Sequence, residues 1–434
     1  MSFDPLAPYS RRLFIKHGVA LASMASTIPA FIQRSMAGML VQGTAGQTSI
    51  PGVPQDRILV VMQLGGGNDG LNTVVPYGMR EYFDARPQLA VAAPGATALG
   101  GAGVALELDK DRGLGINPNL EALKGLYDDG LVSIVQGVGY PNPNRSHFAS
   151  MDIWHTARLD GKGEGWIGRY FDNTCNGTPI PEGAVNIGRS APLAMMGSIQ
   201  KPVSFENPQL FRWLGDELHP ALHDPYQEIN RAGAVGEPEA GSQRDFLMRT
   251  ALDAQVASDR IREAVAKQPL VRYPQSDIAR QLQIVGAMIR DGLGTRVYYV
   301  TKGGFDTHAN QPGGHGNILR QCAEAMKAFN DDLKAQGNQE RVLTLVFSEF
   351  GRRVRQNASQ GTDHGTAAPM FLMGPMVKAG IVGNHPSLTD LDQGDLKFGI
   401  DFRGVYAAVL EEWMKAPSSK VLGGAFDRPA IIKA

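Results

Sequence analysis

The sequence predicts an α/β fold, with a doubly wound, mostly parallel sheet flanked by helices. Three short segments, residues 57–64, 296–301 and 341–347, are rich in Val, Leu, Ile or Tyr. Such nearly continuous apolar runs are typical of strands that are buried on both faces of a parallel sheet. Segments with helical spacing of apolar residues alternate with the strands, which favours a doubly wound sheet.

In chain order, the first of these strands, residues 57–64 (RILVVMQL), is the most apolar and is expected at the centre of the sheet. Residues 120–127 predict a helix, and residues 131–135 predict the next strand. Residues 150–156 have the apolar spacing of a helix start. The helix at residues 120–127 therefore comes before the second strand, as the crossover between parallel strands requires.

Three later segments predict helices that pack on the sheet: residues 276–290, 317–335 and 401–415. In the first of them, Ile, Leu, Val and Met recur at helical spacing, so this helix is expected to face the core. The last one is amphipathic and is expected to lie on the sheet. Together with the strands, these helices predict one α/β domain over residues 50–420.

Between the second strand and the third, the pattern is less regular. Residues 166–223 hold short alternating runs and several prolines, and residues 225–273 are polar and rich in Ala, Arg and Glu. We interpret residues 166–275 as a cap or insertion that supplies substrate contacts, with one or two exposed helices in its second part. It carries no motif that identifies a substrate.

Composition excludes several classes of function. The chain has 434 residues, a formal charge of −1 and 20% charged residues, so no polybasic field is present and nucleic acid is not expected as a partner. Its two cysteines, Cys175 and Cys322, are isolated, which excludes a zinc ribbon or a dithiol redox motif. A disulfide between them in an oxidising compartment stays open.

The first 45 residues predict a targeting leader. Residues 10–16 (SRRLFIK) match the twin-arginine consensus, and the apolar stretch 18–32 that follows is too short and too polar to span a membrane. A cleavage site is expected at residues 35–37, with residues 43–45 as the alternative. Because no other segment is long and apolar enough to span, we expect a periplasmic or secreted protein. The twin-arginine machinery would export it folded, with no stable membrane span after processing. The alternative is a cytosolic amphipathic helix with two chance arginines.

Carboxylate and imidazole side chains gather where the later strands end. The candidate metal ligands there are Asp306, His308, His315, Glu349, Asp363 and His364. Because functional groups collect outside the carboxyl ends of parallel strands, these side chains are expected to converge on a divalent metal such as Zn²⁺ or Mn²⁺. His315 follows His308 across a Pro-Gly-Gly loop, which lets it fold back on the same ion. Taken singly, each motif also suits a turn or a helix cap.

A glycine-rich loop follows the first strand, and it contains a further candidate ligand, Asp69. Residues 65–70 (GGGNDG) let the backbone turn sharply, so this carboxylate can face the same crevice. The loop matches Gly-x-Gly-x-x-Gly, but the residues after it are a poor helix start, and it lacks the Lys-Ser/Thr of a P-loop. A dinucleotide or phosphate loop is therefore disfavoured, and a plain Asn-Asp-Gly turn is the alternative.

Arg145 and Ser146 are the candidate catalytic residues. A serine hydroxyl beside a divalent ion loses its proton more easily and becomes a nucleophile, and a guanidinium matches the geometry of phosphate or sulfate. Alternatively, Ser146 only caps a helix. Two histidines, His147 and His385, are secondary candidates for the metal.

Two residues of the strand-end motif 348–353 have open roles. Glu349 is a ligand or an acceptor that orients a histidine. Arg352 faces the anion or pairs with Glu349.

Together these motifs resemble a known family. The residues that carry the resemblance are 66–73 (GGNDGLNT), 145–148 (RSHF), 305–308 (FDTH), 348–352 (SEFGR) and 362–365 (TDHG). They look like the domain-of-unknown-function 1501 family, which is similar to the alkaline-phosphatase-like superfamily. The resemblance spans residues 55–420.

The resemblance implies a metal site of one or two ions. It places Asp69, Ser146, Asp363 and His364 on one metal, and Asp306 on a second metal, with His308 or His315 and also His385. Asp306 and His308 stand closer together in the chain than is usual in the superfamily. The Cys/Ser-x-Pro-x-Arg pattern of formylglycine sulfatases is absent. These departures leave open one metal instead of two, or a site without catalysis.

The function that these motifs predict is an exported metal-dependent hydrolase of a phosphate or sulfate ester, with a small anionic ester as substrate. The alternative is a non-catalytic exported binding or assembly protein that retains the fold.

Overall fold

The structure is a computed structural model that describes residues 57–98, 102–174, 182–210, 219, 221 and 258–433. The expected leader, Cys175 and most of the second half of the expected cap lie outside these residues. The chain divides into two units, and the larger one draws on Gly43–Glu206 and Lys267–Ala434. Of the smaller unit the structure describes the 3-10 turn Pro208–Leu210 and few other residues; the sheet, the site and the pocket below belong to the larger unit. No helix in the described residues combines the length and apolar character that crossing a membrane requires.

A nine-stranded sheet forms the centre of the unit. Its strands lie in the order β11-β5-β10-β9-β1-β8-β6-β7, and β14 pairs with β5 at the side. The bounds are β1 Ile58–Leu64, β5 Val132–Gly139, β6 Ala184–Ile187, β7 Val203–Phe205, β8 Val297–Lys302, β9 Val342–Phe347, β10 Ala368–Met373, β11 Gly380–Val382 and β14 Ile400–Asp401. β1 pairs in parallel with β8 and β9, so the predicted central strand and its two predicted neighbours are confirmed.

One strand of this sheet runs against the others. β10 is antiparallel to both β5 and β9, whereas β1, β5, β6, β7, β8, β9, β11 and β14 pair in parallel with their other neighbours. The amino end of β10 therefore lies at the same edge as the carboxyl ends of β1, β5, β8 and β9. Residues that precede β10 can then meet residues that follow the other strands.

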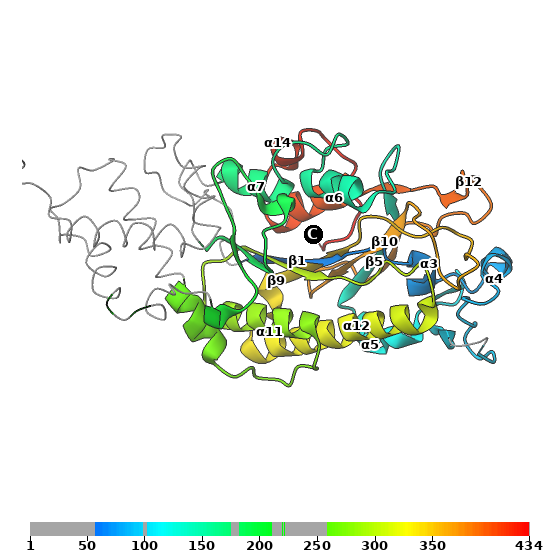
Figure 1. The fold of residues 1–434 in the computed structure, drawn as a ribbon, viewed down its shortest axis with the longest axis horizontal. Helices are drawn as coiled ribbons and strands as arrows, with labels where there is room; N and C mark the ends of the chain where they lie inside the picture. The colour runs from blue at the N-terminus through cyan, green and yellow to red at the C-terminus, as the bar shows by residue number, and fades with distance from the viewer. Residues whose placement is uncertain are drawn as a thin grey trace, which may run out of the picture. The chain divides into compact units, whose positions relative to one another are not determined.

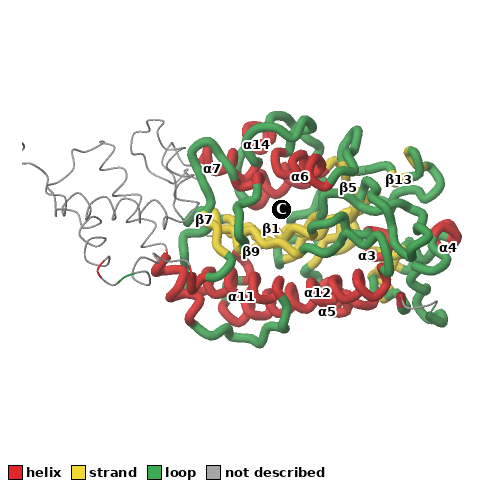
Figure 2. The backbone as a smooth tube through the Cα atoms, viewed as in Figure 1, coloured by secondary structure: helices red, strands yellow, loops and turns green. Residues whose placement is uncertain are grey.

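Helices cover both faces of the sheet, as Figure 1 shows. On one face lie α5 (Glu121–Asp128), α11 (Asp277–Arg290) and α12 (Gln311–Gln336). On the other lie α6 (His147–Thr156), α7 (Trp166–Thr174) and α14 (Ser418–Leu422). Figure 2 shows the strands as a layer between these two sets of helices. The predicted doubly wound α/β class is therefore confirmed.

Smaller elements surround this frame. They are the helices α3 (Gly70–Thr73), α4 (Arg80–Ala85) and α13 (Phe402–Ala408), the π-helical turn Val409–Trp413, the 3-10 turns Pro118–Leu120, Leu193–Met195 and Gln339–Arg341, and the strands β2 (Val74–Val75), β3 (Leu106–Asp109), β4 (Leu114–Ile116), β12 (Leu391–Asp392) and β13 (Asp395–Leu396). β2, β4 and β3 form a three-stranded sheet, and β12 pairs with β13.

The predicted C-terminal helix packs on the sheet as expected. Residues of α13 and of the following π-helical turn, such as Phe402, Tyr406 and Trp413, belong to one core cluster with Leu59 of β1 and Leu345 of β9. Segment 402–413 is therefore part of the main hydrophobic core.

Two segments differ from the prediction. β6 and β7 fall inside the expected cap, yet β6 pairs with β8 and β7 pairs with β6; the first part of that region therefore belongs to the sheet. These strands are short, so the sequence signal is weak. The expected Pro-Gly-Gly loop before His315 is wrong, because α12 already begins at Gln311. Proline suits the first turn of a helix, where its missing N–H costs nothing.

Candidate metal centre

Loops from several strands meet at one edge of the sheet. His147 begins α6, which follows the carboxyl end of β5, and Asp306 follows the end of β8. Glu349 comes directly after β9, and His364 precedes β10. Because β10 is reversed, all four residues lie at the same edge, so the predicted convergence has a direct cause in the sheet topology.

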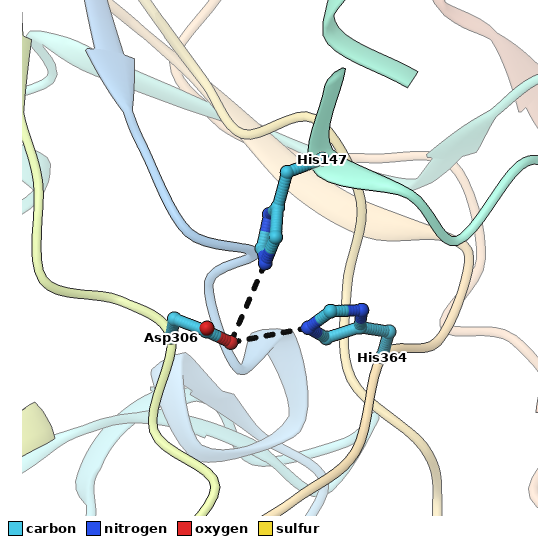
Figure 3. Close-up of side chains that lie close together, drawn as sticks. All are labelled: His147, Asp306 and His364. Atoms are coloured by element: carbon cyan, nitrogen blue, oxygen red, sulfur yellow. Dashed lines mark hydrogen bonds and ion pairs between the residues drawn. The ribbon is translucent and has the colours of Figure 1, made fainter. Parts of the chain in front are cut away.

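Two imidazole rings point at one carboxylate oxygen (Figure 3). Asp306 Oδ1 lies 3.5 Å from His147 Nε2 and 3.1 Å from His364 Nε2. One ligand atom from each of these three residues lies within 4.8 Å of the others. Asp306 is 47% exposed, so the cluster faces solvent. A small molecule can therefore reach these atoms.

A third imidazole adjoins this group. His308 Nε2 lies 3.0 Å from Asp306 Oδ1 and 3.0 Å from His364 Nε2. Two imidazole lone pairs at this distance repel each other unless a proton or a cation lies between them. We define the metal cluster as His147, Asp306, His308 and His364.

An acceptor behind each ring fixes which nitrogen is free. His147 Nδ1 lies 2.8 Å from Glu349 Oε1, and His308 Nδ1 lies 3.2 Å from Asp363 Oδ1. A carboxylate accepts hydrogen bonds, so Nδ1 is the donor in both rings, and Nε2 is the nitrogen that faces Asp306.

The third ring follows the same rule with a backbone acceptor. His364 Nδ1 donates to the carbonyl oxygen of Arg145 over 2.8 Å. Each histidine of the metal cluster therefore directs its Nε2 atom towards Asp306. An oxygen acceptor behind the other nitrogen of a ligating histidine is the usual support of a metal site.

A buried arginine holds the carboxylate in place. Arg352 Nη2 donates to Asp306 Oδ1 over 2.7 Å, and the arginine side chain is fully buried. Burial by itself would raise the pKa of Asp306, but hydrogen bonds from Arg352 and His364 outweigh it and lower the pKa to about 2. Asp306 is therefore ionised at neutral pH. The sequence predicts that Arg352 faces the anion or pairs with Glu349. In the structure it does neither, because its ion-pair partner is Asp306.

The glycine loop after β1 provides the floor of the site. Arg352 also donates to the carbonyl oxygens of Gly66 and Gly67. Gly66 has φ +116°, and a Cβ added there would lie 2.5 Å from the backbone nitrogen of Asp306. This position therefore requires glycine, both for its backbone angle and for the close approach. Only a four-residue helix follows the loop, so the loop lacks the helix that a dinucleotide site would need.

Two predicted ligands stand behind the histidines. Glu349 is 2% exposed, and its Oε1 also accepts from the Gly66 backbone N–H over 2.8 Å. Asp363 Oδ1 accepts from Asn357 Nδ2 and from His308, and the hydrogen bond from Asn357, with that from His308, lowers the pKa of Asp363. In this arrangement both carboxylates orient a histidine.

Asp69 and His315 lie in a different environment. Asp69 Oδ2 forms an ion pair with Arg86 Nη1 at 2.6 Å, and both side chains are fully buried. Burial would raise the pKa of Asp69, but Arg86 overcomes it and lowers the pKa. His315 Nε2 lies 2.9 Å from Asn68 Oδ1, and burial lowers the pKa of His315 to about 4. The structure does not bring these two residues into the metal cluster.

The two predicted catalytic residues, Arg145 and Ser146, come directly before His147 in the chain. Ser146 is the N-cap residue of α6 but makes no side-chain capping bond, and its side chain is exposed. The guanidinium of Arg145 is paired with the buried Asp395, while its backbone carbonyl holds His364. The Ser146 hydroxyl, next to His147 in the chain, therefore has no hydrogen-bond partner among the described residues.

The sequence ranked one member of the cluster too low. His147 was only a secondary candidate because it stands beside a more conspicuous serine, and no strand run directly precedes it. The useful signal is its place in the first loop after a strand. The other secondary candidate, His385, contacts the Pro386 carbonyl oxygen and is not among the residues of the metal cluster.

The donor set of this cluster fits a divalent transition metal. Three imidazole nitrogens and one carboxylate oxygen are ligands that Zn²⁺, Mn²⁺ and similar ions take. The buried His147 Nε2 has no hydrogen-bond partner among the described residues. An unpaired nitrogen beside an ionised carboxylate is what a cation at this position would satisfy.

Sequence comparison relates the chain to a known family. A family model described as "Protein of unknown function (DUF1501)" matches residues 135–422. The search of curated proteins gives no match.

Among solved structures, the chain is similar to a protein in the alkaline phosphatase superfamily from Vibrio parahaemolyticus, with 7% identity, a TM-score of 0.38 and coverage of 91% of this chain and 77% of that one. It is also similar to the PsFucS1 sulfatase from Pseudoalteromonas sp., with 11% identity, a TM-score of 0.38 and coverage of 96% and 77%. A third similar structure is the phosphonate monoester hydrolase SpPMH from Silicibacter pomeroyi, with 9% identity, a TM-score of 0.28 and coverage of 85% and 77%.

Proposed function

Because the chain belongs to the DUF1501 family, whose description assigns no activity, we propose a function from the site itself: an exported, metal-dependent hydrolase of a phosphate or sulfate ester. The observation that supports it most is the metal cluster, in which three histidines direct their Nε2 atoms towards the ionised Asp306. The ester class comes from the resemblance of the motif series to the alkaline-phosphatase-like superfamily.

The residues around the cluster have separate roles in this proposal. His147, His308, His364 and Asp306 hold one or two divalent ions. A bound ion acts as a Lewis acid that polarises the ester and stabilises the charge that develops on it. Arg352 keeps Asp306 ionised and in place, because its guanidinium is buried against that carboxylate.

Ser146 is the proposed nucleophile. Its exposed hydroxyl has no hydrogen-bond partner among the described residues and stands directly before a ligand. Its oxygen forms a bond to the phosphorus or sulfur, the bond to the ester oxygen breaks, and the alcohol leaves with one proton. Water then hydrolyses the seryl ester and restores Ser146. Arg145 is the proposed holder of a non-bridging oxygen, for which it would give up part of its pairing with Asp395.

Export is the other part of the proposal. The twin-arginine motif at residues 10–16 supports passage through the twin-arginine machinery to a periplasmic or secreted location. That pathway carries folded proteins, so the ion can be bound before export.

The decisive experiment measures metal and turnover on the same samples. The folded protein, purified without chelator, is analysed by ICP-MS and assayed with 4-nitrophenyl phosphate and 4-nitrophenyl sulfate. We expect about one or two equivalents of a transition metal, together with hydrolysis of one ester. Asp306→Asn and His147→Ala should lose both metal and turnover.

Ser146→Ala separates catalysis from metal binding. It should keep the metal and lose hydrolysis, while Ser419→Ala, which removes an exposed hydroxyl from α14, should change neither. A protein that binds metal but hydrolyses neither ester would favour the rival function, a non-catalytic binding or assembly protein. A folded protein that takes up no metal would refute the hydrolase outright.

A further inference from the structure

A mostly apolar pocket lies beside the metal cluster. Its volume is about 300 Å³, at the lower end of the range of small-molecule sites. Aromatic side chains supply much of its lining: Tyr140, Trp154, Phe350 and Phe398. Phe398 is 38% exposed although it is a large apolar side chain, so the pocket is open to solvent at this residue.

The pocket and the metal cluster share a wall. Glu349 lines the pocket, and the same residue accepts the hydrogen bond of His147 Nδ1 over 2.8 Å. Phe350 also lines it, and the centre of its ring lies 4.9 Å from the ring centres of both His147 and His364. A molecule in the pocket therefore contacts Glu349 and Phe350, which lie against histidines of the metal cluster.

Most polar groups of the lining are already engaged. The Thr366 hydroxyl donates to the Leu396 carbonyl oxygen over 2.5 Å, and Lys397 pairs with Asp390. The Glu349 carboxylate accepts from the Gly66 backbone, His147 and Ser348. A sugar, which needs a hydrogen-bond partner for each hydroxyl, would leave several of its hydroxyls unpaired here.

One buried donor in the lining is unpaired. Trp154 is 2% exposed, and its Nε1 has no hydrogen-bond partner among the described residues. Its ring is held between Phe347 and Phe402, with ring centres 5.2 Å and 4.3 Å away. A buried indole N–H usually has an acceptor; here the ring is fixed instead by its stacking on two phenylalanines.

We propose that this pocket binds an aromatic alcohol as the organic part of the substrate, so that the substrate is an aryl phosphate or an aryl sulfate. That the bound molecule is a substrate rests on the proposed hydrolase function, but binding to the pocket is tested separately. A flat ring packs against the aromatic lining, while the ester group lies towards the metal cluster.

Binding of 1-naphthol, a neutral aromatic alcohol without an ester group, tests the pocket independently of catalysis. We expect isothermal titration calorimetry to show one binding site. Phe398→Ala, which removes an exposed ring from the lining, should weaken binding about tenfold. Leu270→Ala, which removes another exposed apolar side chain (53% exposed) outside the lining, should leave it unchanged. Phe398→Leu keeps apolar volume and should give an intermediate affinity.

Lack of 1-naphthol binding, or equal binding by wild type and Phe398→Ala, would overturn the proposal. If the protein hydrolyses esters, Phe398→Ala should also reduce its preference for 1-naphthyl phosphate over methyl phosphate, measured as the ratio of kcat/KM values. If it hydrolyses none, the proposed function fails, and 1-naphthol binding still decides whether the pocket takes an aromatic alcohol.

Discussion

Each histidine of the metal cluster depends on the oxygen behind its ring. Glu349, Asp363 and the Arg145 carbonyl each accept from one Nδ1, and the three Nε2 atoms then face Asp306. If these acceptors were lost, a ring could rotate or change its tautomer. In the proposed function, the affinity for metal thus depends partly on residues that do not touch the ion.

Replacing Glu349 by Gln tests this dependence. The glutamine keeps the shape but loses the charge that orients His147, so we expect metal affinity to fall about 10–100-fold. A competition titration against a chromogenic chelator measures the change. Glu121→Gln, an exposed substitution in α5, is the matched control. An unchanged affinity in Glu349→Gln would mean that His147 is not a ligand.

For single residues, the sequence predicted which types of side chain form the site better than which residues they contact. Asp306 and His308 were recognisable because they follow a strong apolar run, and His364 because it stands in an Asp-His-Gly motif. The separation of Asp69 from them was not predictable, since its partner Arg86 lies in a segment without any motif. The binding of Arg352 to Asp306 likewise depends on a contact between residues 46 positions apart.

Among the structural elements, the loop after β1 places the strictest demand on sequence. Gly66 approaches the Asp306 backbone so closely that a methyl group does not fit, and its φ of +116° disfavours any side chain. This loop accordingly sets the position of the carboxylate at the centre of the cluster.

Gly66→Ala should therefore destabilise the protein by about 3 kcal/mol, from backbone strain and overpacking combined. Urea denaturation followed by circular dichroism measures the loss. Gly303→Ala is the control, because a Cβ at Gly303 meets nothing within 4 Å. Equal stability of the two variants would show that the close approach at Gly66 is relieved without cost.

The strands show what the pattern of apolar residues can predict by itself. β1, β8 and β9 were predicted because strands buried on both faces are apolar throughout. The reversal of β10 has no such signature, since a buried strand reads alike in either direction. The convergence of His364 with the other loops depends on that reversal, so the clustering of motifs predicts it but the strand pattern does not explain it.

Across the whole molecule, buried neutral histidines make stability depend on acidity. Burial lowers the pKa values of His155 and His315 to about 4, below the ordinary value of about 6.5. The unfolded chain therefore takes up these protons first as the pH falls. Their contribution is complete above about pH 6.5 and is lost progressively towards pH 4.

We expect each of these histidines to add up to about 1.4 kcal/mol per pH unit to the slope of unfolding free energy against pH in this window. Urea denaturation at pH 7, 6 and 5 gives the slope. His155→Gln should reduce it by about one proton, whereas His219→Gln, at an exposed position, should not. An identical slope in wild type and His155→Gln would mean that His155 is already protonated in the folded protein.

The reversed strand also affects the order of events in folding. The ligands of the metal cluster span residues 147–364 and meet only after β5, β8, β9, β1 and the antiparallel β10 have all joined one sheet. Contacts of such long sequence separation form late, because loop closure must precede them. Metal uptake should therefore lag behind sheet formation, so that a bound ion marks a chain whose folding is complete.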